Sequence, residues 1–248
     1  MTAATLPVDE SLGATLQRLA GAQKGAAGAP AYSRFVNRRL GRLLAALAFH
    51  AGLTPNAVTG VSALFTGTGI ALLALAPLSW TTGIAVAACL VLGYALDAAD
   101  GQLARLRGGG SPAGEWLDHM VDALKIASLH IAVLIGLHRS GVVEEGLLLV
   151  PLGFSVVATV LFFATLLNEA MRAQHGVVTR SQPTGYRPSV VRSLIVLPTD
   201  YGLLCCVFIL FGAPTLFLSV YALLFFAVAA FLALASVTWF REMKRLPR

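Results

Sequence analysis

The chain has 248 residues, of which 57% are hydrophobic and only 12% are charged, and its mean hydropathy is +0.77. Soluble domains carry about 25% charged residues, so this composition excludes an ordinary water-soluble domain and indicates a polytopic membrane protein. The 18 lysines and arginines outnumber the 12 acidic residues, and the net charge of +6 must lie at the edges of apolar stretches. The three cysteines all lie in apolar runs, which excludes a disulfide framework and a metal-binding Cys-x-x-Cys site.

The first thirty residues are rich in alanine and glycine and contain the acidic pair Asp9 and Glu10. They lack the basic-then-apolar order of a secretory signal. We therefore predict a disordered cytosolic tail over residues 1–31.

An amphipathic helix is predicted for residues 32–50, because arginines recur there among apolar residues at helical spacing. Such a helix suits the cytosolic surface of a membrane. Two interpretations of its arginines stay open: they only enforce the topology, or they bind an anionic ligand. Arg38 and Arg42 are the candidate acceptor-binding residues of this helix.

The 54 positions from 43 to 96 carry no Asp, Glu, Lys or Arg, whereas about 20 helical residues suffice to cross a bilayer. Two spans must fit there, separated by a turn with an interfacial Trp at 77–80. Glycine-rich, polar and proline-containing breaks divide the rest of the chain. The predicted fold class is all-α, with six transmembrane helices in a catalytic domain over residues 51–244. The expected helices are Pro55–Ala76, Thr81–Leu106, Pro112–His138, Leu147–Arg172, Pro188–Phe211 and one after Pro214 that ends near Phe240.

The basic residues set the orientation of these spans. Of the 18 lysines and arginines, 16 flank the span ends that lie on the same side as both termini. The opposite side holds Arg139 alone, near Glu144 and Glu145. The positive-inside rule therefore places both termini and the candidate site on the cytosolic side. We expect a cell membrane of the bacterial type.

Four carboxylates mark the candidate site. Asp97 and Asp100 are three residues apart at the end of the second span, and Asp118 and Asp122 are four apart at the start of the third. Each pair therefore projects from one helix face, and the short glycine-rich link makes the two helices antiparallel neighbours. Four converging carboxylates cannot all ionise unless cations neutralise them. Oxygen ligands alone suit Mg²⁺, Mn²⁺ or Ca²⁺ better than zinc.

Small residues and an arginine surround these carboxylates. Gly101 and Ala104 lie on the same helical face as the carboxylates and leave space for a large ligand. Gly114, on the facing helix, adds no side chain to that space. Arg105 can neutralise a phosphate that the metal ions also hold. Enzymes that transfer phosphoryl groups combine these features: cations and an arginine stabilise charge on the transferred group, and a carboxylate acts as the base.

The segment from Asp97 to Asp122 reads D-x2-D-G-x2-A-R-x8-G-x3-D-x3-D. It resembles the signature of the CDP-alcohol phosphotransferase family, also called CDP-alcohol phosphatidyltransferases, without a departure. The resemblance extends over roughly Ser33 to Phe240, although only 26 residues carry the specific motif. It implies transfer of a substituted phosphate from a CDP-alcohol, often CDP-diacylglycerol, to the hydroxyl of a second alcohol, with release of CMP.

The resemblance also implies roles for individual residues. Asp97, Asp100 and Asp118 would bind two divalent cations, Mg²⁺ or Mn²⁺, and Asp122 would bind metal and act as the catalytic base. The implied contacts to the CDP donor are Asn56, Thr59, Gly101, Ala104, Arg105, Ser111 and Gly114. Asn56 and Thr59 are also ordinary residues for a helix that starts after a proline.

Other polar residues near the motif receive plainer interpretations. Glu115 lies in the first turn of its helix, where capping is favoured over metal ligation. His119 points about 100° away from Asp118 on an ideal helix, so we interpret it as a packing or interfacial histidine. A polar end to the fourth span could line an acceptor pocket or be simple interfacial polarity. Its residues are Asn168, Glu169 and Arg172.

Lys125 and Asp200 fall inside predicted spans and are not explained by the motif. At about 1.5 Å per residue they lie roughly 20 Å and 18 Å below the cytosolic ends of their helices. A lone charge at that depth costs on the order of 3 kcal/mol. We therefore predict an ion pair between the third and fifth helices that serves packing. In the competing interpretation, Asp200 lines an acceptor cavity that reaches down from the metal site, and Lys125 is its counter-ion.

The sequence thus predicts an integral membrane enzyme that joins a CDP-activated alcohol to an acceptor alcohol, in a homodimer that binds no nucleic acid. The donor is CDP-diacylglycerol or a soluble CDP-alcohol. The acceptor stays open among glycerol phosphate, inositol or its phosphate, serine, a sugar and a phospholipid head group. The alternative is a divalent-cation transporter or binding protein, although a transporter would spread its polar residues along a path, and here they cluster at one end.

Overall fold

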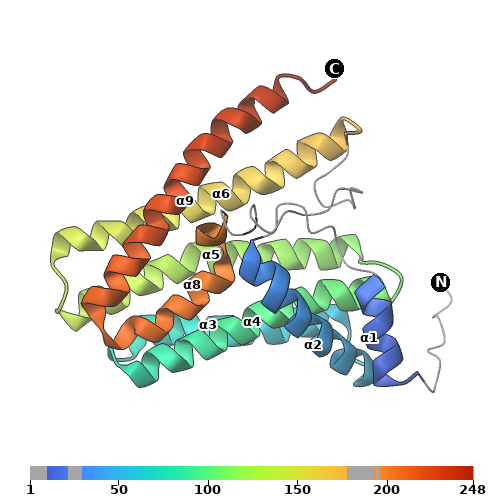
Figure 1. Cartoon of the computed structure of the whole chain (residues 1–248), viewed down its shortest axis with the longest axis horizontal. Helices are drawn as coiled ribbons and strands as arrows, with labels where there is room; N and C mark the ends of the chain where they lie inside the picture. Colours follow the sequence, from blue (N-terminus) through green and yellow to red (C-terminus); the bar gives the residue numbers. More distant parts are fainter. Residues whose placement is uncertain (1–9, 22–29, 178–192, 194–195, 248) are drawn as a thin grey trace.

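A computed structural model describes residues 10–21, 30–177, 193 and 196–247, and within these ranges the chain is helical without a strand (Figure 1). The all-α prediction is confirmed for this part of the chain. The elements in chain order are α1 Leu12–Gly21, η1 Ser33–Asn37, α2 Arg38–His50, α3 Pro55–Leu75, α4 Trp80–Leu106, α5 Pro112–Ser140, η2 Glu145–Leu148, α6 Leu149–Gln174, η3 Leu197–Thr199, α8 Tyr201–Val207, η4 Phe208–Gly212 and α9 Pro214–Met243.

Five helices of the described residues are long and apolar enough to cross a membrane: α3, α4, α5, η2 with α6, and α9. The chain is therefore an integral membrane protein. The sixth apolar helix, Tyr201–Gly212, is too short for a full span. The expected helix Pro188–Phe211 is wrong over its described part, because Asp200 has an extended backbone and its side chain caps α8. Residues 188–192 lie outside the described ranges, as do Arg180 and Arg187 of the preceding loop.

The hairpin of α4 and α5 is fixed by local sequence signals. Gly108 and Gly109 have φ angles of 96° and 127°, a backbone conformation that favours glycine. Ser111 then caps α5, since its hydroxyl accepts a hydrogen bond of 3.1 Å from the backbone N–H of Gly114. Pro112 occupies the first helical turn, where its missing N–H costs nothing. These signals place the end of α4 beside the start of α5.

The segment expected to be a disordered tail contains a helix. α1 packs on α2, and Thr15 and Leu19 are buried in that contact. Thr15 Oγ1 lies 3.1 Å from His50 Nε2, and the guanidinium of Arg18 donates to the carbonyl oxygen of Leu106 at 3.3 Å. The prediction of disorder over residues 1–31 is therefore wrong for α1. Ten residues are too few for a stable isolated helix, so the tertiary contacts decide its formation.

The predicted amphipathic segment 32–50 is covered by η1 and α2. One face of this segment packs on α4, where Ala45 and Phe49 are buried with their neighbours. The opposite face carries exposed leucines at positions 40, 43 and 47. An exposed apolar stripe of this kind suits a membrane surface, and the placement of α2 at that surface stays a prediction.

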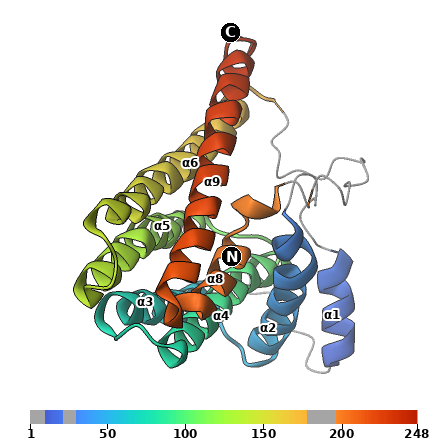
Figure 2. The same ribbon diagram turned by 60° about the vertical axis from the view of Figure 1, so that its left-hand side comes forward.

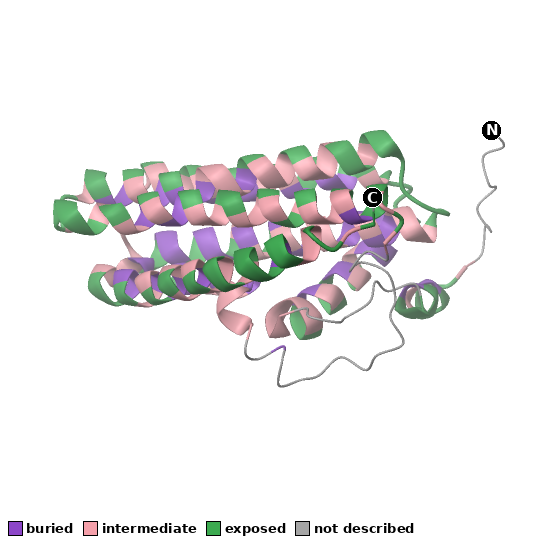
Figure 3. Ribbon diagram, turned by 90° about the horizontal axis from the view of Figure 1, so that it is seen from above, coloured by how far each residue is buried: buried purple, intermediate pink, exposed green. Residues whose placement is uncertain are grey.

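The long helices bury their inner faces against one another, as the colouring in Figure 3 shows. α3 packs on both α4 and α5, and α6 packs on α5 and α9. The later halves of α6 and α9 run side by side and diverge from α5 in both ribbon views (Figures 1 and 2).

We expect Gly136→Ala to lower the melting temperature by several degrees. A Cβ at this position of α5 would lie 2.1 Å from the carbonyl oxygen of Leu73, a backbone atom of α3. The two helices would have to separate, and overpacking of this kind costs about 1–3 kcal/mol. Thermal unfolding in detergent, followed by tryptophan fluorescence, measures the change.

Gly67→Ala on α3 is the matched control, because no atom lies within 4 Å of the Cβ it would add. Alanine is the better helix former by about 1 kcal/mol, so this variant should be at least as stable as the wild type. Equal melting temperatures for the two variants would contradict the close approach of α3 and α5.

Candidate active site

The four motif carboxylates lie at one end of the α4–α5 hairpin. Asp97 and Asp100 occupy the last turns of α4, and Asp118 and Asp122 occupy the early turns of α5. Asp100 is buried, and the other three are partly exposed. α3 packs on both α4 and α5, and the side chain of Lys125 on α5 bridges Asp97 of α4 and Asp122 of α5.

Asp100 is held by the helix that precedes the hairpin. The hydroxyl of Thr59 on α3 donates to its Oδ2 at 2.6 Å. Thr59 was predicted to contact the CDP donor, and the structure shows it orienting this carboxylate. A neutral hydroxyl fixes the position of Asp100 without neutralising its charge.

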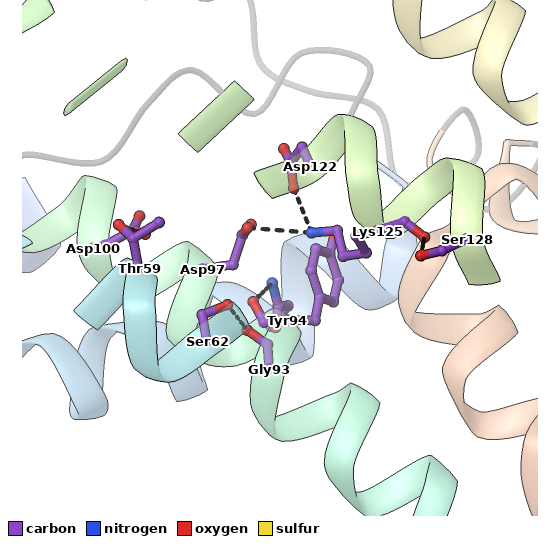
Figure 4. A network of polar contacts seen from close by, with 10 residues as sticks. Thr59, Ser62, Gly93, Tyr94, Asp97, Asp100, Asp122, Lys125 and Ser128 are labelled. Carbon is purple, nitrogen blue, oxygen red and sulfur yellow. Dashed lines mark hydrogen bonds and ion pairs between the residues drawn. The ribbon is translucent and has the colours of Figure 1, made fainter. Parts of the chain in front are cut away.

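Asp97 and Asp122 share a cation, as Figure 4 shows. The ammonium of Lys125 lies 3.2 Å from Asp97 Oδ1 and forms an ion pair with Asp122 Oδ1. The side chain of Lys125 is only 7% exposed. The contact joins α4 to α5 and holds the two carboxylates on one side of the site.

The predicted ion pair of Lys125 and Asp200 is wrong. The carboxylate of Asp200 accepts hydrogen bonds from the backbone N–H groups of Ser33 at 2.9 Å and Gly202 at 3.1 Å. The error came from comparing backbone depths alone. A lysine has a long flexible stem, so its ammonium reaches Asp122, one turn away on its own helix, and Asp97 on α4.

A cavity of about 570 Å³ opens beside Asp100 and Asp118. Its walls come from the start of α3, the end of α4, the glycine-rich turn and the start of α5. All seven residues predicted to contact the donor line it: Asn56, Thr59, Gly101, Ala104, Arg105, Ser111 and Gly114. Asp97 and Asp122 are outside this lining, on the side of the carboxylates where Lys125 lies.

Two glycines affect the shape of the cavity because they lack side chains. A Cβ at Gly114 would lie 3.0 Å from Asn56 Oδ1, so this glycine permits the close approach of α3 and α5. A Cβ at Gly101 would meet only Arg105 Nη1, at 3.5 Å. Gly101 is therefore not required by packing within the protein, and its missing side chain leaves room in the cavity.

The family model described as CDP-alcohol phosphatidyltransferase matches residues 52–240. The chain belongs to this family. It is accordingly a transferase of substituted phosphate groups in phospholipid biosynthesis, with CDP-alcohol and alcohol substrates and a membrane lipid environment. A comparison with curated protein sequences found no match.

His119 is closer to the transferase site than the sequence indicates. Asp118, His119 and Asp122 each offer a ligand atom, and these atoms lie within 4.8 Å of one another. His119 Nε2 is also 3.9 Å from Glu115 Oε1, and both side chains line the cavity. An ideal-helix projection gives only the direction of Cβ, whereas an imidazole ring reaches back toward its neighbours. The spacing of four between Glu115 and His119 was the signal that we missed.

The candidate acceptor residues are divided between two places. Arg38 is half-buried on α2, and its guanidinium is close enough to that of Arg105 for the two charges to repel. Burial is the main influence that lowers the pKa of Arg38, and a partly desolvated guanidinium gains from an anionic partner. Arg42, one turn further along α2, is also partly exposed. Neither arginine lines the cavity of this transferase.

The polar end of α6 faces a different neighbour. Arg172 is buried and forms an ion pair with Glu242 of α9. Asn168 and Glu169 lie on the same part of α6, which diverges from α5. These three residues are outside the cavity lining, and the contact of Arg172 with α9 favours a packing role for it.

Proposed function

We propose that this transferase moves a substituted phosphate group from CDP-diacylglycerol to the hydroxyl of an acceptor alcohol and releases CMP. The cavity beside the motif is the observation that carries the proposal. α4 contributes Asp100, Arg105 and the space left by Gly101 to its lining, and α5 contributes Asp118. Its volume of about 570 Å³ falls within the range of about 300–1,000 Å³ for small-molecule sites.

The donor atoms at the site fit divalent cations. Four carboxylates converge from two helices, and cations must offset their repulsion if a pyrophosphate is to bind there. Asp118, His119 and Asp122 offer ligand atoms within 4.8 Å of one another. Two Mg²⁺ or Mn²⁺ ions, when bound, would supply positive charge that stabilises the phosphate oxygens in the transition state.

The residues of the chain supply the remaining chemistry. Asp122 takes the proton of the acceptor hydroxyl, whose oxygen then attacks the β-phosphorus of the donor. A new P–O bond forms as the bond from this phosphorus to the bridging oxygen breaks, and CMP leaves with the bonding electrons. Arg105 contacts the donor phosphates, and its charge stabilises the leaving group. Asp122 lies outside the donor cavity, which suits an acceptor that approaches from the opposite side.

We also propose that the site opens on the cytosolic side. This orientation rests on the 16 of 18 basic residues that share one side of the predicted spans. A cytosolic opening suits a nucleotide donor whose lipid part stays in the membrane. A homodimer is a further proposal, which crosslinking of the purified protein tests.

CMP release by the purified protein tests the proposed function. CDP-diacylglycerol is supplied in mixed micelles with Mg²⁺ and a set of labelled acceptors: glycerol phosphate, inositol, inositol phosphate and serine. We expect CMP to form together with one labelled lipid product. A soluble CDP-alcohol offered with a lipid acceptor tests the opposite assignment of donor and acceptor. Absence of CMP from every donor, together with cation uptake into vesicles, would support the alternative of a cation transporter.

A further inference from the structure

The end of α4, which borders the donor cavity, is held by a side chain of α1. The last four backbone carbonyl groups of a helix have no partner within the helix. At the end of α4, three of these carbonyl oxygens accept hydrogen bonds from backbone N–H groups of the following turn: those of Leu103, Ala104 and Arg105. The carbonyl oxygen of Leu106 instead accepts from the guanidinium of Arg18, at 3.3 Å. Arg18 therefore fixes the peptide group that joins Leu106 to Arg107.

A small apolar core connects α1 to the elements that form the cavity. Leu19 of α1 is buried in one cluster with Phe49 of α2, Val58 of α3 and Leu103 of α4. The start of α3 and the end of α4 also contribute residues to the cavity lining. α1 lies beside α2 in both ribbon views (Figures 1 and 2) and outside the segment 52–240 that matches the family. An element outside the matched segment thus supports the donor site.

Arg107 is a cavity residue that neither the motif nor the proposed mechanism uses. It is exposed, and it lines the donor cavity at the C-terminal end of α4. The guanidinium carbon of Arg107 lies 5.9 Å from the centroid of the Phe49 ring, and that of Arg18 lies 5.8 Å from the same centroid. An aromatic ring attracts a guanidinium at this distance. Phe49 therefore holds both arginines next to the cavity.

The two arginines differ in the charges around them. Arg18 forms an ion pair with Glu10, which offsets its charge. Within the described part of the chain, Arg107 forms no ion pair with a carboxylate. A guanidinium presents its N–H groups in a planar fork that matches the oxygen atoms of a phosphate. The charge of Arg107 is therefore available to an anionic ligand in the cavity.

We propose that Arg107 binds a phosphate oxygen in the CMP half of the donor, and that Arg18 is a positioning residue for Arg107. Arg18 acts through the peptide group between Leu106 and Arg107 and through the ring of Phe49. The inference rests on the proposed function, because it adds two residues to the same donor site. It gives α1 a role in donor binding.

Binding of CMP to the purified protein in Mg²⁺, measured by calorimetry, tests the contact without turnover. Arg107→Gln should weaken CMP binding by about tenfold or more, as the loss of a hydrogen bond between charged groups does. Cytidine has no phosphate, so it should compete with labelled CMP at the same cytidine affinity in both proteins. An equal loss of affinity for cytidine would overturn the phosphate contact.

Arg139→Gln is the matched control. Arg139 is an exposed arginine in the last turn of α5, so it shares with Arg107 the favourable effect of a cation at a helix C-terminus. It lies outside the cavity lining, and its variant should bind CMP like the wild type. Equal losses in Arg107→Gln and Arg139→Gln would show that the helix end, and not the donor, needs the charge.

A double-mutant cycle tests the positioning role of Arg18. Arg18→Gln should weaken CMP binding by about threefold or more, and it should have no further effect in the Arg107→Gln background, because coupled residues are not additive. A purely structural role would reduce the affinity equally in both backgrounds and would overturn the role of Arg18. Wild-type CMP affinity in Arg107→Gln would overturn the whole inference. If the wild type neither binds CMP nor releases it from any donor, the proposed function fails as well.

Discussion

Asp122→Asn is expected to reduce CMP release by about 10² to 10⁴-fold, the usual contribution of a general base. The amide keeps the volume of the side chain but cannot take the proton of the acceptor hydroxyl. It also removes one of the two carboxylates that hold Lys125. Initial rates of CMP release at saturating donor measure the effect, and thermal unfolding shows whether the variant is folded.

Glu144→Gln is the control for the loss of one carboxylate, because Glu144 is exposed in the connection between α5 and α6. We expect wild-type rates from it. A folded Asp122→Asn variant that keeps more than about a tenth of the wild-type rate would show that another group is the base.

Removal of divalent cations is expected to abolish transfer, and Mg²⁺ or Mn²⁺ should restore it. The reason is electrostatic: the clustered carboxylates of α4 and α5 repel a pyrophosphate until cations reverse the local charge. Lys125 offsets part of this charge at Asp97 and Asp122 and does not contact Asp100. CMP release is measured after dialysis against EDTA and again after each metal is returned.

A monovalent salt at equal ionic strength is the control for screening, since exposed charges are screened by any salt. It should not restore activity. If transfer continued at the full rate after exhaustive chelation, the metal-dependent mechanism would be wrong.

The elements that frame the site could be predicted because their signals are local. Ser111 and Pro112 start α5, and Gly108 and Gly109 provide the turn before it. Given this hairpin, the spacing places Asp100 and Asp118 in one cavity lining and leaves Asp97 and Asp122 bridged by Lys125. The seven residues that the resemblance assigns to the CDP donor also line one cavity, five of them from the α4–α5 hairpin and two from the start of α3.

The remaining features depend on contacts between distant segments. Ser11 caps α1, since its hydroxyl accepts a hydrogen bond from the backbone N–H of Ala14, but ten residues are too few for a stable helix without the packing on α2. Asp200 was placed inside a span, but its carboxylate binds the backbone of Ser33, 167 residues earlier in the chain. Lys125 and His119 differ from prediction for another reason. Their partners depend on how far their side chains extend. The predictions used only the backbone depth of Lys125 and the helical angle of His119.

The α4–α5 hairpin also bears on how the protein enters its membrane. All four carboxylates lie within 26 consecutive residues, so they enter the bilayer in a single helix pair. An acidic hairpin would be costly to insert, since each charge in the apolar layer is unfavourable by a few kcal/mol. Lys125 lies on the same helix as Asp122, three residues further on, and forms its ion pair within that helix. The hairpin thus carries part of its own neutralisation during biogenesis, before any later span has been synthesised.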